Sequence, residues 1–135
     1  MTDLVVDTSA AFAILTDEPT ADDLSDALSE ASLRLISAAT LVELGIVLES
    51  RLGPAGQAVT NQFVAASAVE VAAVDARLAG LALEGWRRFG RGRHPARLNY
   101  GDCFTYALAV DRGLPILCTG EDFARTDVSV VRPAA

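Results

Sequence analysis

The stretch that decides the fold is "LVVDTSAAF", residues 4–12, in which three apolar residues precede an acid, two hydroxyl residues and a helix-like run. Residues 4–6 are typical of a short buried strand, and residues 9–15 predict a helix. Asp7 lies at the junction, where a side-chain oxygen accepts hydrogen bonds from the unpaired N–H groups of a helix N-terminus. Asp7 is therefore either a helix cap or part of a catalytic site, and the rest of the chain must decide.

The alternation of apolar runs and helical stretches continues along the chain. It predicts strands at 33–36, 69–74, 114–119 and 128–131, and helices at 20–31, 38–51, 55–68, 75–89 and 101–110. Strands that are apolar throughout and separated by helices indicate an α/β fold, a parallel sheet with helices on both faces. We expect a single domain over residues 1–135. Ligands of such sheets bind beyond the carboxyl ends of the strands, where the strand order reverses.

Arginine is concentrated in one segment of an otherwise acidic chain. The net charge is −7, which argues against a protein that coats nucleic acid through a broad basic face. All 11 basic residues are arginine, and five of them lie in "WRRFGRGRHPARLNY", residues 86–100: Arg87, Arg88, Arg91, Arg93 and Arg97. Together with Trp86, Phe89 and Tyr100, they form a local basic patch with aromatic neighbours, which could position the phosphates and stack on the unpaired bases of a single-stranded nucleic acid. The alternative is a solvated helix end whose aromatic side chains pack in the core.

Other features of the sequence exclude several classes. The N-terminus lacks the basic residues of a secretion signal, so we expect a cytoplasmic protein. The longest uncharged run, residues 52–69, contains glycine, proline, asparagine and glutamine, which argues against a membrane span. Cys103 and Cys118 lack the spacing of a zinc site and are expected to be reduced packing residues. The single histidine, His94, excludes a metal-free ribonuclease built on a histidine pair and is expected in a solvated loop.

Five carboxylates stand where the predicted topology could gather them. Asp7 ends the first strand, Glu121 and Asp122 follow the fourth, Asp102 opens the helix before it, and Glu43 lies in the helix after the second. Each aspartate alone could be a helix cap or a first-turn acid. Glu43 is surrounded by apolar residues, where a carboxylate costs desolvation unless it extends to water or meets a cation.

Together these carboxylates indicate a metal site. The chain contains no lysine, and clustered carboxylates raise one another's pKa unless a cation lies among them. Oxygen-only sites suit Mg²⁺ or Mn²⁺, which keep bound waters for a phosphate substrate. Such a site activates water and neutralises the charge on a phosphodiester. The sequence therefore predicts metal-assisted phosphodiester hydrolysis.

Four motifs in this order resemble one known family. They are "VVDTSA" at the N-terminus, Glu43 after the second strand, "LNYGDCFTYALA" and "TGEDFARTDV". The chain resembles the PIN-domain ribonucleases over essentially its whole length, most closely the VapC-type toxins of bacterial toxin–antitoxin pairs. The resemblance implies a parallel sheet of five strands, cleavage of RNA that depends on Mg²⁺ or Mn²⁺, and inhibition by a co-encoded antitoxin.

The resemblance also implies roles for particular residues. Asp7, Glu43, Asp102 and Asp122 match the family's acidic quartet, with Asp7 and Asp102 as direct metal ligands and Glu43 and Asp122 as further candidates. Asp122 is preferred to Glu121 because the family pattern places an acid directly before Phe123. Neighbouring polar residues could orient carboxylates or waters, or could serve as ordinary caps and turns: Thr8, Ser9, Asn99, Thr119 and Glu121.

Two alternative functions remain at this point. A phosphatase of the haloacid dehalogenase type, or a receiver domain, would need a second acid near the first and a lysine, yet the segment is "DTS" and lysine is absent. A non-catalytic RNA-binding or interaction module would be expected to have lost one of the four acids. The apolar hairpin of residues 38–68 offers side chains for an antitoxin helix or a second copy, so we expect a homodimer or a toxin–antitoxin hetero-oligomer: Val47, Leu48, Leu52 and Phe63.

Overall fold

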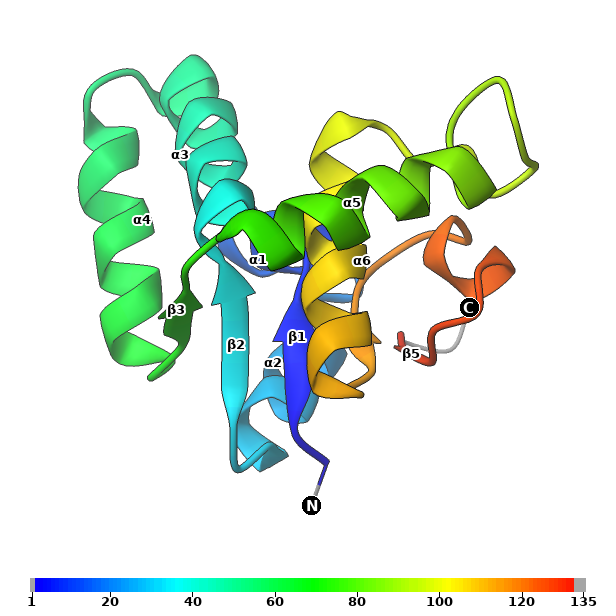
Figure 1. The fold of residues 1–135 in the computed structure, drawn as a ribbon. Coiled ribbons are helices and arrows are strands. Elements are labelled where there is room, and N and C mark those ends of the chain that lie inside the picture. The colour runs from blue at the N-terminus through cyan, green and yellow to red at the C-terminus, as the bar shows by residue number, and fades with distance from the viewer. Residues whose placement is uncertain (1, 133–135) are drawn as a thin grey trace.

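The computed structural model describes residues 2–132 and is built on a five-stranded sheet in which every neighbouring pair of strands is parallel (Figure 1). The strands are β1 (Leu4–Val6), β2 (Arg34–Ser37), β3 (Glu70–Ala72), β4 (Ile116–Leu117) and β5 (Val130–Val131). Their order in the sheet is β3-β2-β1-β4-β5, so the first strand is the central one. The predicted parallel α/β sheet is confirmed, although most strands are shorter than the apolar runs that predicted them.

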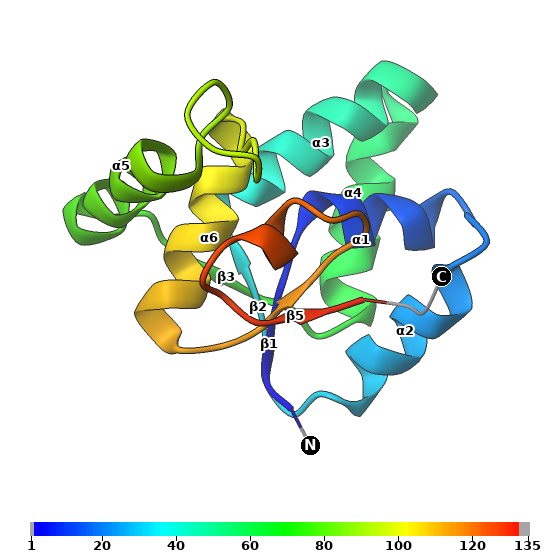
Figure 2. The same ribbon diagram turned by 90° about the vertical axis from the view of Figure 1, so that its right-hand side faces the viewer.

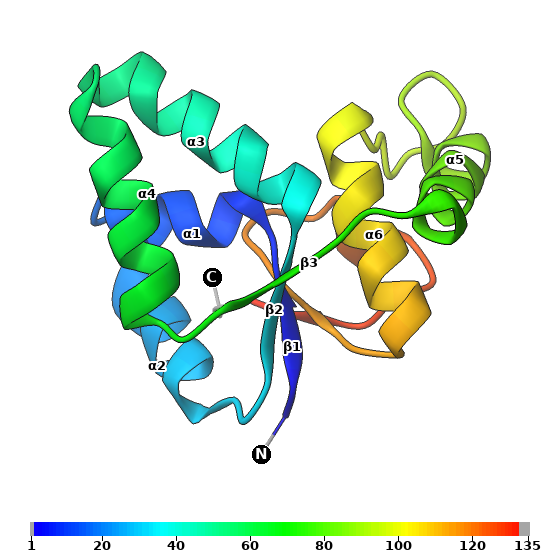
Figure 3. The same cartoon turned by 60° about the vertical axis from the view of Figure 1, so that its left-hand side comes forward.

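Helices cover both faces of the sheet, as the sequence pattern predicted. They are α1 (Thr8–Leu15), α2 (Ala21–Glu30), α3 (Ala38–Leu52), α4 (Ala55–Ala66), α5 (Ala76–Phe89) and α6 (Tyr100–Arg112), followed by the 3₁₀ helix η1 (Phe123–Arg125). Figure 3 shows α1 to α4 on one side of the strands and α5 and α6 on the other.

Two hydrophobic cores result from this layering. Val5 and Ile116 pack with the core that lies beneath α5 and α6, whereas Leu4, Val6 and Leu117 pack with the core beneath α1 to α4. Successive residues of a strand point to opposite faces of a sheet. A strand between two cores is therefore apolar at every position, which explains why the short strands read as continuous apolar runs.

The strand order reverses between β1 and β4. From β1 the chain moves outward through β2 to β3, and α5 and α6 then return it to β4 on the other side of β1. The ends of the two central strands are tied together, because the Asp7 N–H donates to the Leu117 carbonyl at 3.1 Å and the Thr119 N–H donates to Ser9 Oγ at 3.1 Å. Ligands of open parallel sheets bind at such a reversal, and Asp7 lies at this position.

The α3–α4 hairpin does not offer the surface that the sequence predicted. Leu48 and Phe63 are only 0% and 4% exposed and belong to the core, so their expected role as partner contacts is wrong. The exposed apolar residues of α3 are Val42 and Ile46, both 61% exposed, and Leu52 at its end. The helix is apolar on nearly all sides, and periodicity alone could not tell which apolar stripe meets the sheet.

Two further expectations can be compared with the structure. Cys103 and Cys118 are both free and buried, as expected of packing residues. Within residues 2–132, no helix is long and apolar enough to cross a membrane.

Two glycines allow a matched test of the packing. A Cβ on Gly56 of α4 would overlap the backbone of Leu48 and Glu49 in α3, whereas a Cβ on Gly80 of α5 would meet nothing within 4 Å. Gly56→Ala should lower the free energy of unfolding by about 1–3 kcal/mol, because two helix backbones must separate. Gly80→Ala should raise it by about 0.5–1 kcal/mol, because alanine stabilises a helix. Urea denaturation measures both, and equal effects would contradict this account of the hairpin.

Candidate functional site

Asp7 is a buried acid at the carboxyl end of the central strand. Its side chain is 4% exposed and accepts two hydrogen bonds, from the Ser9 N–H to Oδ2 at 3.0 Å and from Thr105 Oγ1 to Oδ1 at 2.9 Å. Burial raises the pKa of Asp7 even though these hydrogen bonds favour the charged form. Asp7 does cap α1, but capping involves only one carboxylate oxygen and does not require burial.

Thr105 is a contact of Asp7 that the sequence analysis missed. It is fully buried and lies 2.9 Å from Thr40 Oγ1, so hydroxyl groups of α3 and α6 meet beneath the Asp7 carboxylate. The sequence does indicate this contact, because Thr105 follows Asp102 by three residues and therefore lies on the same face of the helix. A hydroxyl within the apolar run "CFTYALA" marks a polar contact inside the core.

Glu43 reaches the same end of the sheet from α3. Its half-buried carboxylate accepts a hydrogen bond at Oε1 from Thr8 Oγ1 at 2.6 Å. Its other oxygen, Oε2, lies against Gly101 of α6, where any Cβ would overlap it. Glycine at position 101 therefore lets the first turn of α6 approach the Glu43 carboxylate.

Asp102 forms a capping box with Asn99 at the start of α6. The Asn99 N–H donates to Asp102 Oδ2 at 3.0 Å, and the Asp102 N–H donates to Asn99 Oδ1 at 2.8 Å. Burial raises the pKa of Asp102 to about 7, and the negative charges of Asp7, Glu43 and Asp122 contribute to the rise. The four acids thus lie close enough to oppose one another's ionisation.

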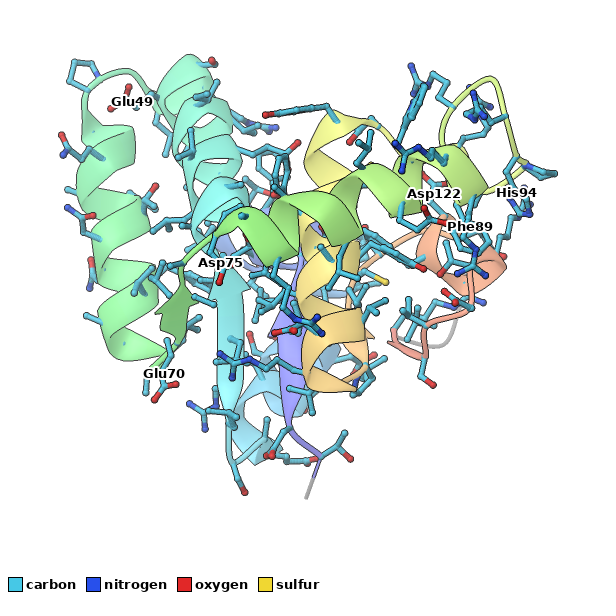
Figure 4. All side chains as sticks on the ribbon, viewed as in Figure 1. Glu49, Glu70, Asp75, Phe89, His94 and Asp122 are labelled. Atoms are coloured by element: carbon cyan, nitrogen blue, oxygen red, sulfur yellow. The ribbon has the colours of Figure 1, made fainter. Side chains whose placement is uncertain are left out.

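The adjacent acids Glu121 and Asp122 have different surroundings. Glu121 Oε1 pairs with Arg132 Nη1 at 2.8 Å, and Arg132 also donates to the Gly120 carbonyl at 3.0 Å. Asp122 is exposed, and its side chain makes no capping hydrogen bond to η1. Figure 2 shows η1 between α6 and α1, and Figure 4 labels Asp122 on this segment. The geometry therefore favours Asp122 over Glu121 as the fourth acid.

The donor set fits a hard divalent cation. Among residues 2–132, no arginine forms an ion pair with Asp7, Glu43, Asp102 or Asp122. In the same part of the chain, no three Asp, Glu, His or Cys side chains lie close enough together to hold a metal ion among them. Mg²⁺ commonly binds one or two carboxylates and keeps several waters, so a full cage of protein ligands is not required. Asp7 and Asp102 could hold such an ion, with Glu43 and Asp122 near it.

Some of the arginines that were predicted to contact RNA interact with other residues of the protein. Arg87 lies 3.5 Å from Glu84, Arg88 pairs with Asp127 at 3.1 Å, and the Arg93 guanidinium lies 4.7 Å from the centre of the Trp86 ring. All five arginines, Arg87, Arg88, Arg91, Arg93 and Arg97, are exposed at the end of α5 or in the loop before α6.

The aromatic residues of this segment divide between core and surface. Phe89 is 8% exposed and packs against Tyr106 and His94, so the expectation that it could stack on an RNA base is wrong. His94 is half-buried rather than solvated, and its Nδ1 accepts the Ala96 N–H at 3.0 Å. Trp86 and Tyr100 remain available, at 41% and 81% exposed.

Comparisons with known proteins agree with this geometry. The sequence matches the family described as "PIN domain" over residues 4–129. "Ribonuclease VapC" of Mycolicibacterium smegmatis is 48% identical over 95% of this chain and 99% of its own length. "Ribonuclease VapC30" of Mycobacterium tuberculosis is 43% identical over 95% of this chain and 98% of its own.

Solved structures share the fold. The crystal structure of Mycobacterium tuberculosis VapC20, described as a sarcin-ricin loop cleaving toxin, has a TM-score of 0.79 at 23% identity and covers 97% of this chain and 100% of its own. VapBC2 from Rickettsia felis, bound to a DNA fragment of its promoter, has a TM-score of 0.77 at 13% identity, covering 97% and 98%. The family match spans all four acids and the relatives cover nearly the whole sequence, so this chain belongs to the PIN-domain family, among the VapC proteins.

Proposed function

We propose that the protein is a metal-dependent endoribonuclease, the toxin of a toxin–antitoxin pair, which hydrolyses RNA phosphodiester bonds with Asp7, Glu43, Asp102 and Asp122. The observation that carries this proposal is the meeting of these acids, without cationic partners among residues 2–132, at the reversal of strand order. Relatives that are 40–48% identical to this chain are named ribonucleases, which supports the same activity.

Asp7 and Asp102 are proposed to hold Mg²⁺ or Mn²⁺, which when bound polarises a water molecule and neutralises charge on the phosphate. The hydrogen bonds from Ser9 and Thr105 keep the Asp7 carboxylate from rotating, so its free lone pairs point in fixed directions. Asn99 fixes one oxygen of Asp102 in the same way.

Glu43 and Asp122 are proposed to act on water. Thr8 occupies Glu43 Oε1, which leaves Oε2, the oxygen beside Gly101, to accept a proton from the attacking water. Asp122 is exposed and can hold waters at the rim of the site. The arginines of residues 87–97 supply cationic surface that the acidic cleft lacks, and they are proposed to bind the phosphates of RNA.

The proposed protein partner is a cognate antitoxin. Solved complexes with this fold include "DNA bound VapBC from Salmonella typhimurium" and VapBC-5 from Mycobacterium tuberculosis, which support a toxin–antitoxin assembly. Val42 and Ile46 flank Glu43 on α3 and are both 61% exposed, so they offer apolar contacts beside the acids. We propose that the protein acts in the cytoplasm as a homodimer or as a hetero-oligomer with the antitoxin.

Substitution can distinguish a proposed metal ligand, Asp7, from an acid outside the site, Glu121. Asp7→Asn should lower the rate of cleavage of an unstructured RNA by at least about 100-fold in Mg²⁺ or Mn²⁺, because a metal ligand is lost. Glu121→Gln should leave the rate close to wild type, because Glu121 pairs with Arg132 rather than with the site. A gel-based cleavage assay of antitoxin-free protein measures both. Full activity of Asp7→Asn would contradict the proposed mechanism.

Gly101 offers a test of the Glu43 contact. Gly101→Ala should lower the cleavage rate by about 10- to 100-fold, because the new methyl group displaces the Glu43 carboxylate. The free energy of unfolding should change by less than about 1 kcal/mol, since only a flexible side-chain end must move. Gly80→Ala, on an exposed helix face, is the control. Wild-type activity of Gly101→Ala would show that the position of Glu43 is unimportant.

The raised pKa of Asp102 predicts a dependence of stability on pH and metal. The folded state holds the Asp102 proton up to about pH 7, whereas the unfolded chain releases it near 3.8. Without metal, stability should therefore fall as the pH rises from about 4 to about 7. At pH 8, Asp102→Asn should be more stable than wild type by about 1–2 kcal/mol.

With a divalent metal, wild type should become more stable than Asp102→Asn at pH 8. Mn²⁺ binds the folded state only, so it should raise the melting temperature of wild type and raise that of Asp102→Asn much less. Thermal melts at pH 5 and pH 8, with and without Mn²⁺, measure these effects. A wild-type protein that gains stability towards pH 8 without metal would contradict this description of the acids.

A further inference from the structure

A pocket of about 540 Å³ lies between α5 and the start of α6, beside the acids but separate from them. Its walls include Trp86 and Leu83 of α5, Tyr100 and Phe104 of α6, and Arg91 and Asn99 of the intervening loop. We propose that this pocket binds an unpaired nucleobase of the RNA next to the phosphate that is cut. The inference rests on the proposed ribonuclease function and assigns the base-binding subsite of that activity.

The aromatic side chains of the pocket are placed to stack on a base. Tyr100 is 81% exposed, and its ring packs in a T-shaped arrangement with Phe104, with ring centres 5.0 Å apart. Trp86 is 41% exposed and rests against Gly90, where a Cβ would overlap its indole ring. Exposed aromatic rings that are held in place lose little conformational freedom when a base stacks on them.

The charge around the pocket suits a nucleotide. Among residues 2–132, Arg91 is the only charged residue that lines the pocket, and Arg93 lies over the Trp86 ring. Nearby Glu84 interacts with Arg87, so its charge is partly offset. On a chain of net charge −7, this rim is the place where the phosphates that flank a stacked base would meet cations.

Asn99 connects the pocket to the proposed catalytic acids. It lines the pocket, and its side-chain oxygen accepts the Asp102 N–H at 2.8 Å. Among residues 2–132 its side-chain amide nitrogen makes no hydrogen bond, so two donor hydrogens are available to the edge of a base. A base in the pocket would therefore contact Asn99, which is itself hydrogen-bonded to Asp102. This position suits a nucleotide adjacent to the cut phosphate.

A second copy of the chain is the main competing occupant, because the pocket is apolar and exposed. A two-fold dimer that buried this surface would place the same patch on both sides. The cationic rims of Arg91 and Arg93 would then face each other, which opposes such a contact. The same rims attract RNA.

Fluorescence tests the inference without relying on catalysis. Trp86 is the only tryptophan, so its emission reports on the pocket directly. Antitoxin-free, full-length Asp7→Asn protein, which is not expected to cut, would be titrated with a short unstructured RNA. We expect the RNA to quench Trp86 fluorescence, and an RNA with abasic sites to bind without quenching.

Variants in the same background identify the contacts. Tyr100→Ala should weaken RNA binding by about 10- to 100-fold, whereas Tyr100→Phe should restore it, because the ring rather than the hydroxyl stacks. Arg91→Gln should reduce the salt dependence of binding by about one unit of slope. The matched controls are Leu52→Ala and Arg112→Gln, which remove an exposed apolar residue and an exposed arginine outside the pocket and should bind as the parent does.

The outcomes separate this inference from the ribonuclease proposal. Metal-dependent cleavage by wild type, combined with no quenching and unchanged binding by Tyr100→Ala, would overturn the pocket and leave the proposed function intact. A homodimer that Tyr100→Ala dissociates, with RNA affinity per protomer unchanged, would assign the pocket to a second copy and overturn the inference. Failure of wild type to cleave or bind any RNA would refute both.

Discussion

The Asp7 carboxylate is buried at the carboxyl end of the central strand, where desolvation opposes its charge. Three other acids approach it from α3, α6 and the segment after β4. Burial raises the pKa of Asp102, one of these acids, to about 7, and the charges of the other acids add to the rise. No arginine among residues 2–132 neutralises these four acids. A site of this kind makes the folded chain less stable than it could be, which is common where a protein prepares a place for a cation.

The rest of the fold supplies the contacts that hold this arrangement. Thr105 and Ser9 donate to the two oxygens of Asp7, Thr8 donates to Glu43, and Asn99 donates to Asp102. These three carboxylates therefore each have at least one fixed oxygen and free lone pairs. These contacts connect α1, α3 and α6 to the end of β1. Substitutions that loosen the packing of these helices would therefore alter the site without touching an acid.

Much of the fold could be predicted because parallel strands between two cores have a distinctive apolar pattern. The acids could be found for a similar reason, since a carboxylate in an apolar setting needs an explanation. Thr105 was missed because its place in an apolar run predicts a buried polar contact but does not say which group it contacts. The burial of Leu48 and Phe63 could not be predicted, because apolar residues on nearly every side of a helix do not reveal which stripe meets the sheet. Phe89 could have been assigned to the core, because it lies in helical phase with Leu78 and Ala82 on the buried face of α5.

Proton release on metal binding tests the central claim most directly. Mn²⁺ would be titrated into antitoxin-free wild type by calorimetry at pH 6.5, in two buffers of different ionisation enthalpy, and again at pH 8. Binding should release protons at pH 6.5, because Asp102, whose pKa is raised to about 7, must give up its proton, and it should release fewer protons at pH 8. Absence of binding, or binding without proton release at pH 6.5, would contradict the assignment of these acids as a metal site.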